Sequence, residues 1–136
     1  MGRILLAACA LVVALFAPAA WAAPALTLGP VDVPASEEAQ RPTLVEIARA
    51  EVDKTPSLPA GAPRREISLS LVSIDRSGGR VRCVVSAAVR DPKSGRLLGA
   101  ASGNASVEAK APSPRVERAV LAAAVQSAVS GAVRVR

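Results

Sequence analysis

The sequence predicts an α+β fold in two layers, an antiparallel sheet of three to four strands with two helices packed on one face. Three observations predict it. Residues 65–109 contain three runs of alternating polar and apolar residues, separated by glycine-containing turns, which is typical of consecutive antiparallel strands. One helical pattern precedes these runs, and another follows them. The chain has 136 residues, which is enough for one domain with a modest core.

The first 22 residues predict a secretory signal peptide that is cleaved after Ala22. Arg3 supplies the positive start, Ile4–Phe16 the apolar core, and Ala20–Ala22 the small-x-small cleavage motif. The apolar run is shorter than the roughly 20 residues of a membrane-spanning helix. The alternatives are a retained anchor and lipid modification of Cys9, although Cys9 lies too early for an apolar core to precede it. We therefore expect a periplasmic or secreted protein with no transmembrane segment in the mature chain.

The mature chain is predicted to begin with residues 23–40, as an extended N-terminal segment or a first strand, followed by one α+β domain over residues 41–136. Arg41–Lys54 reads as the first helix, because Pro42 suits a first turn and Leu44, Ala48 and Val52 recur on one face. Residues 55–63 hold three prolines and a glycine, which predicts a loop.

Three strands are predicted next, over residues 66–71, Arg80–Arg90 and Arg96–Ala109. The turn at residues 75–79 contains two glycines, and the turn at residues 91–95 ends in Gly95, which suits a left-handed backbone conformation. Alternation places Cys83 on the inner face of the second strand. In the third strand the predicted inner face consists mainly of small residues: Leu97, Gly99, Ala101, Gly103, Ala105, Val107 and Ala109.

The second helix is predicted over Ser113–Arg134. Ser113 is a favourable N-cap and Pro114 a favourable first-turn residue. The small residues of the preceding strand would let this helix approach the sheet closely, so that a core without aromatic rings still reaches native packing density.

The composition excludes several kinds of chemistry. The chain has no histidine, the commonest general base and metal ligand. The only Phe and Trp, at positions 16 and 21, leave with the signal peptide, so base stacking is excluded and nucleic acid is a poor partner. The three lysines lie at predicted turns or helix ends, which disfavours a Ser–Lys catalytic pair. We expect no enzyme, no cofactor and no metal site. Cys83 is interpreted as a small buried hydrophobe, with an intermolecular disulfide as the alternative.

Positive charge is concentrated after residue 63. We predict a candidate patch for an anionic partner, with the alternative that these side chains are ordinary surface charge. Its residues are Arg80, Arg82, Arg90, Lys93 and Arg96.

A stretch at residues 89–98 has the pattern Val-Arg-Asp-x-x-Ser-Gly-x-Leu-Leu, and a small-residue strand and an Ala-rich helix follow it. This arrangement resembles periplasmic α+β domains of bacterial envelope lipoproteins, of the curli secretion channel subunit or penicillin-binding-protein activator type, over roughly Ile67–Val133. The resemblance implies a two-layer fold and a partner-binding role, and it transfers no catalytic or pore residue. The predicted function is a non-catalytic adaptor that binds another envelope protein. The alternative is an electrostatic binder of anionic membrane or cell-wall surface.

Overall fold

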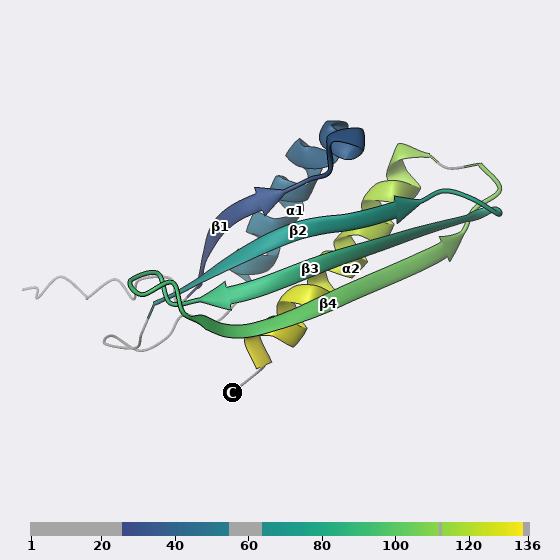
Figure 1. Cartoon of the computed structure of the whole chain (residues 1–136). Helices are drawn as coiled ribbons and strands as arrows, with labels where there is room; N and C mark the ends of the chain where they lie inside the picture. The colour runs from purple at the N-terminus through teal and green to yellow at the C-terminus, as the bar shows by residue number, and fades with distance from the viewer. Residues whose placement is uncertain (1–25, 55–63, 112, 135–136) are drawn as a thin grey trace, which may run out of the picture.

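The computed structural model describes residues 26–54, 64–111 and 113–134 (Figure 1). The predicted signal peptide and Cys9 lie outside these residues. The elements in chain order are β1 (Leu26–Asp32), the short 3₁₀ segment η1 (Ala35–Gln40), α1 (Arg41–Asp53), β2 (Arg65–Asp75), β3 (Arg80–Arg90), β4 (Leu97–Glu108) and α2 (Pro114–Arg134).

The four strands form one sheet in the order β1-β2-β3-β4. β2, β3 and β4 pair antiparallel, which confirms the three predicted strands. β1 is a strand of the sheet and not a free arm, and it pairs with β2 in parallel. The parallel direction follows from the connection: α1 lies between β1 and β2, and parallel neighbours need such a crossover.

Both helices lie on one face of the sheet, as predicted (Figure 1). The core between the two layers is aliphatic. Its largest buried side chains are Leu44, Ile67, Leu69, Leu71 and Leu121, and Cys83 is 1% exposed among them. The inward prediction for Cys83 is therefore confirmed. The open face of the sheet, opposite the helices, carries mainly Ser and Ala at its centre and arginines toward the two ends of β3, and no described helix lies on it.

A β-bulge in β2 extends the core beyond the predicted strand. Leu71 pairs with Val85, but Ser73 pairs with Val84, so Val72 is the extra residue and is 54% exposed. The bulge changes the phase of the alternation, so that Leu71 and Ile74 both contact the core. Simple alternation after Leu71 would have turned Ile74 away from the helices.

α2 packs tightly on β3 and β4 and begins as predicted. The Ser113 hydroxyl accepts a hydrogen bond from the Val116 amide at 3.3 Å, which is the expected N-cap contact. A Cβ added at Gly131 would lie 2.8 Å from the Cβ of Ala101. The small residues of β4 thus allow the close approach that the sequence predicted.

One detail of the predicted β4 face is wrong. Gly99 and Gly103 are buried under α2, but Leu97 pairs with Arg90 after a register shift and is 50% exposed. Leu98 is the extra residue at this shift. Leu97 therefore lies on the same face as its partner Arg90, and not on the buried face with Gly99.

By length and composition, α2 also meets the criteria for a membrane span, the one such helix in the described residues. Core helices of soluble domains meet the same criteria. Here α2 contributes seven residues to the core: Val120, Leu121, Ala124, Val125, Ala128, Val129 and Ala132.

Candidate interaction surface

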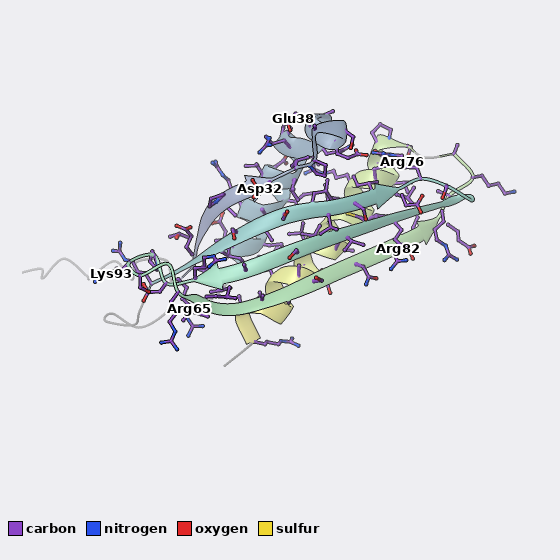
Figure 2. The ribbon with its side chains drawn as sticks, in the orientation of Figure 1. Asp32, Glu38, Arg65, Arg76, Arg82 and Lys93 are labelled. Atoms are coloured by element: carbon purple, nitrogen blue, oxygen red, sulfur yellow. The ribbon has the colours of Figure 1, made fainter. Side chains whose placement is uncertain are left out.

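The structure divides the predicted basic patch between the two ends of the sheet. Arg80 and Arg82 lie at the start of β3, and Arg90 lies at its end, about 33 Å from Arg80 and about 26 Å from Arg82 at the usual rise per residue. Figure 2 shows Arg82 and Lys93 at opposite ends of the molecule, with Arg65 near Lys93. The patch is therefore two groups of cations, which cannot bind one small anion together.

Acidic neighbours partly neutralise the first group. Arg80 forms an ion pair with Glu108 at 3.4 Å, and Arg82 lies opposite Asp75 across β2 and β3. Hydrogen bonds from Ser77, together with the charge of Arg82, hold the pKa of Asp75 below its usual range. Asp75 is therefore ionised at neutral pH beside these arginines.

We call the second group the hairpin-end cluster, made of Arg65, Arg90, Lys93 and Arg96. Glu66 lies opposite Arg90 across β2 and β3, as Asp75 lies opposite Arg82, whereas Lys93 and Arg96 lie in an exposed turn. Arg90 donates to the Gly95 carbonyl oxygen at 3.2 Å, which positions it over the 91–96 turn. The turn is closed by the Gly95 amide, which donates to the Asp91 carbonyl oxygen at 2.8 Å, and Gly95 has the predicted positive φ of 73°. These contacts fix the loop that carries Lys93 and Arg96 at this end of the sheet.

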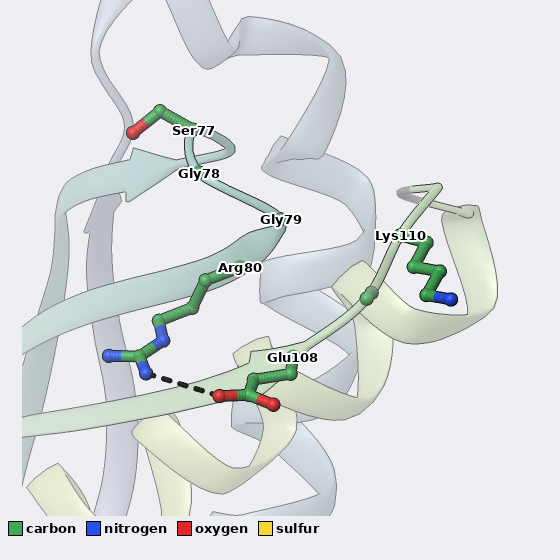
Figure 3. A pocket seen from close by; sticks show the side chains of 7 residues that line it. Ser77, Gly78, Gly79, Arg80, Glu108 and Lys110 are labelled. Carbon is green, nitrogen blue, oxygen red and sulfur yellow. Dashed lines mark hydrogen bonds and ion pairs between the residues drawn. The ribbon is translucent and has the colours of Figure 1, made fainter.

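A hollow of about 590 Å³ lies at the other end, between the β2–β3 turn and the residues that follow β4 (Figure 3). The Arg80–Glu108 ion pair crosses one side of it, and Lys110 lines it. Its only hydroxyl, that of Ser77, donates to the Asp75 carboxylate at 2.6 Å. The lining contains no histidine, and the Ser77 hydroxyl is held by the carboxylate of Asp75, whose pKa is lowered by this bond.

No group of three or more His, Cys, Asp or Glu side chains that could hold a metal ion occurs within residues 26–54, 64–111 and 113–134. Cys83, the one cysteine in the same ranges, is not available as a nucleophile, because burial raises the pKa of its thiol to about 11.

A bridge built around Arg76 was not predicted from the sequence. Its guanidinium donates to both carboxylate oxygens of Glu37, at 2.8 and 2.9 Å, and also to Glu117. Gln40 donates to the same Glu117 at 3.2 Å. The bridge therefore joins η1, the end of β2 and the first turn of α2, and its partners are 39 and 41 residues from Arg76 along the chain.

β4 has an outer edge without a neighbouring strand in the described part of the chain. We call this the β4 edge, residues 97–108. It runs for 12 residues, contains no proline or lysine, and has Glu108 as its one charged residue. Such an edge presents a row of backbone N–H and C=O groups that another strand can pair with.

The opposite edge, at β1, is protected in two ways. β1 has seven residues, and Pro30 within it has no amide hydrogen to donate. Arg41 also donates to the Val31 carbonyl oxygen at 2.6 Å, which occupies an acceptor of that strand. The two edges therefore differ in their capacity to accept another strand.

The helix surface beside the β4 edge is made mainly of small side chains. Ser127 lies next to Gly103, where an added Cβ would approach its side chain to 3.0 Å. Ala123 and Ser130, one turn before and after Ser127, are exposed. We call Ala123, Ser127 and Ser130 the α2 flank. Arg134, one turn after Ser130 on the same stripe of α2, is also exposed, so the last turn of the helix adds a charge beside this flank.

No family model and no curated protein matches the chain. Its path is similar to that of several solved structures. A PelC dodecamer from Paraburkholderia phytofirmans has 11% identity and a TM-score of 0.49, over 76% of this chain and 88% of that chain. A putative lipoprotein from Caulobacter crescentus has 20% identity and a TM-score of 0.36, over 76% and 82%. A minor lipoprotein from Acinetobacter baumannii has 11% identity and a TM-score of 0.42, over 76% and 87%.

Two of these structures are described as bacterial lipoproteins, and at these TM-scores the likeness carries no argument about the family of this chain. It does not support the curli channel or the penicillin-binding-protein activator as the specific type. With identities of 20% or less and TM-scores below 0.5, the likeness describes the path of the chain, and no function is transferred from it.

Proposed function

We propose that this chain is a non-catalytic, exported domain of the bacterial cell envelope that binds a partner protein by adding a strand of the partner to the β4 edge. The observation that carries the proposal is the contrast between the long β4 edge, in which only Glu108 is charged, and the β1 edge with Pro30 and Arg41. The export and the absence of catalysis are supported by the signal-peptide pattern and by the lack of histidine.

Main-chain hydrogen bonds would supply the affinity of such a complex, and the alternating side chains of β4 its specificity. On the open face these side chains are Ala100, Ser102, Asn104 and Ser106, all exposed. Their small size leaves the backbone accessible, and they favour a partner strand with larger side chains above them.

A photo-crosslinking amino acid at Ser102 tests this proposal in cells. We expect Ser102 to give a discrete crosslinked product that persists above about 0.3 M salt, where the Debye length is only a few Å. The same amino acid at Arg49, which is exposed on α1, is the matched control and should give no such product. Absence of a product from every exposed β4 position would contradict the proposal.

A second candidate function is electrostatic binding to anionic membrane or cell-wall polymer, supported by the hairpin-end cluster at one end of the sheet. Retention on envelope fractions that disappears at a few hundred millimolar salt would favour it over strand addition, because ionic contacts are screened and main-chain pairing is much less so.

A further inference from the structure

We propose that the tip of the β3–β4 hairpin, residues 90–98, inserts Leu97 and Leu98 into the surface of an anionic phospholipid bilayer. This inference rests on the second candidate function, because it uses the hairpin-end cluster, and it commits that function to one occupant, a lipid bilayer. It does not depend on the addition of a strand to the β4 edge.

The first observation is a pair of exposed leucines at this tip. Leu97 is 50% exposed and Leu98 is 37% exposed, and they are the only leucines among the large hydrophobic side chains exposed in the described residues. The register shift between Val89 and Arg90 places both outside the core. Single exposed leucines are common on proteins, but two adjacent ones at the end of a sheet form an apolar patch, and such patches mark contacts with partners or membranes.

The second observation is the charge around the leucines. Arg96 directly precedes Leu97, Arg90 pairs with Leu97 across β3 and β4, and Lys93 lies in the turn between the two strands. Apolar side chains beside cations are the composition of a surface that binds a bilayer interface, because the former enter the acyl boundary and the latter contact lipid phosphates. A stable protein interface needs about 800 Å² per partner, which two leucines at a hairpin tip do not supply.

Two carboxylates near the tip do not cancel this charge. The Asp91 carboxylate accepts a hydrogen bond from the Lys93 amide at 2.8 Å, and Glu66 lies opposite Arg90 across β2 and β3. The hairpin-end cluster has four cations beside these two carboxylates, so this end of the sheet has a net positive charge. At the opposite end, by contrast, each of the two arginines of β3 has a carboxylate of its own beside it.

The turn that carries the cations is held in one shape by its own hydrogen bonds. The Asp91 amide donates to the Arg96 carbonyl oxygen at 2.9 Å, and the Arg96 amide donates to the Ser94 hydroxyl oxygen at 3.3 Å. Cations and leucines are therefore presented together, and binding does not have to order a flexible loop. This preorganisation lowers the entropic cost of binding.

The position of the tip leaves room for a bilayer. The β3–β4 turn projects from the end of the sheet beyond both described helices, and Lys93 lies there (Figures 1 and 2). A bilayer can thus approach the tip without meeting a described helix. The strands would then point away from the lipid, which leaves the β4 edge accessible to a partner strand.

Co-sedimentation of the purified protein with vesicles of phosphatidylglycerol and phosphatidylcholine tests the proposal. We expect Leu97→Ser with Leu98→Ser to weaken vesicle binding at least about tenfold, since two apolar side chains no longer leave water. Val72→Ser with Val107→Ser is the matched control, because these valines are also exposed but lie away from the tip, and it should leave binding nearly unchanged. Far-UV circular dichroism checks that both variants remain folded. Equal losses in the two variants would overturn the proposal.

An environment-sensitive fluorophore reads insertion directly. Attached to Leu98→Cys, it should shift its emission to shorter wavelength when vesicles are added, and spin-labelled lipid should quench it. Attached to Val107→Cys, it should show neither change. Cys83 is 1% exposed and does not take up the label. A fluorophore at position 98 that stays in water while the protein is bound to vesicles would contradict insertion.

The outcomes separate this inference from the functions proposed above. If the wild type binds the vesicles and the double leucine variant binds them equally well, insertion is wrong and electrostatic binding stands. If the wild type does not bind anionic vesicles even at low salt, both the insertion and the electrostatic binding of a membrane are wrong. Neither result changes the crosslink expected at Ser102, which tests strand addition alone.

Discussion

At the level of single residues, Gly103 controls how closely α2 lies on the sheet. A Cβ at this position would meet the backbone of Ala124 and Ala128 well inside contact distance. Backbone atoms of a packed helix cannot move aside as a flexible side chain can. We therefore expect Gly103→Ala to destabilise the fold by about 1–3 kcal/mol or more, through overpacking. Urea unfolding followed by circular dichroism measures this change.

Asn104→Ala is the matched control, because Asn104 is the next residue in β4 and is exposed on the open face. It should change the unfolding free energy by less than about 0.5 kcal/mol. If the two substitutions cost the same, the close approach of α2 to Gly103 is not what limits this position.

Cys83 makes the free energy of unfolding change with pH in the alkaline range. Burial raises the pKa of its thiol from 9.0 to about 11, so the folded state holds the proton more tightly than the unfolded state. This contribution to stability is complete below about pH 9 and decreases as the pH rises toward 11. We expect Cys83→Ala to remove this part of the pH dependence, which denaturant unfolding between pH 8 and 11 would measure. An unchanged slope in the variant would contradict the assignment.

Between elements, the Arg76 bridge is the contact that ties η1 and α2 to the end of β2. Arg76→Met keeps the aliphatic stem and removes the charge. We expect a loss of roughly 0.5–1 kcal/mol, because the pairs remain partly solvated. The bond from Arg76 lowers the pKa of Glu37, so its contribution is present at neutral pH and is lost as the pH falls through that lowered value. The difference between wild type and variant should therefore shrink in acid.

Arg118→Met is the control for that experiment. Arg118 donates to Glu46 at 2.8 Å and also joins two helices, but both side chains are about half exposed or more. Solvent screening makes this pair weaker, so its loss should change stability less than the loss of the Arg76 bridge. If both substitutions lower the stability equally, neither the second carboxylate of the Arg76 bridge nor its partial burial adds to the stability.

The features that were predicted correctly from the sequence are those that depend on residues close together in the chain. Alternation at Arg80–Arg90, the glycines of the two turns and the cap at Ser113 each depend on a few adjacent residues, and all three are present in the structure. The bulge at Val72 was not predicted, because it depends on which residues of β2 and β3 pair with each other, and the residues around Val72 alone do not show this. The Arg76 bridge was not predicted either, since its partners are about 40 residues away.

The candidate site was predicted less well than the fold, for the same reason. The alternation correctly placed Arg80, Arg82 and Arg90 on the face opposite Cys83. The length of the predicted strand already separates these arginines into two groups, and the prediction of a single patch overlooked it. The β4 edge was also missed, because whether a strand is at an edge depends on the order of the whole sheet.

At the scale of the whole molecule, the fold is asymmetric in three respects. Helices cover one face of the sheet and leave the other open, one strand edge is protected and the other is not, and the less paired cations lie at one end. A core without described aromatic residues buries little area per residue, at about 25 cal/mol per Å². Added surface from a partner would therefore contribute substantially to the stability of this domain.

The asymmetry of charge predicts which end of the molecule an anionic surface contacts. Vesicles of phosphatidylglycerol and phosphatidylcholine are a suitable probe, with binding measured by co-sedimentation. Each basic residue near such a surface contributes about 1 kcal/mol when it is not already paired. Arg80 and Arg82 have Glu108 and Asp75 beside them. Arg90 likewise has Glu66 opposite it, but Lys93 and Arg96 lie in an exposed turn.

We therefore expect Arg90→Gln, Lys93→Gln and Arg96→Gln together to reduce vesicle binding by more than about tenfold, and Arg80→Gln with Arg82→Gln to reduce it much less. The triple variant removes three positive charges and the double variant removes two, so the loss of vesicle binding is compared per charge removed. Binding should also fall steeply with salt, in proportion to the charges that contact the surface. An equal loss per charge in the two variants would mean that the open face lies flat on the membrane, because only that orientation brings both ends of β3 to one surface at once.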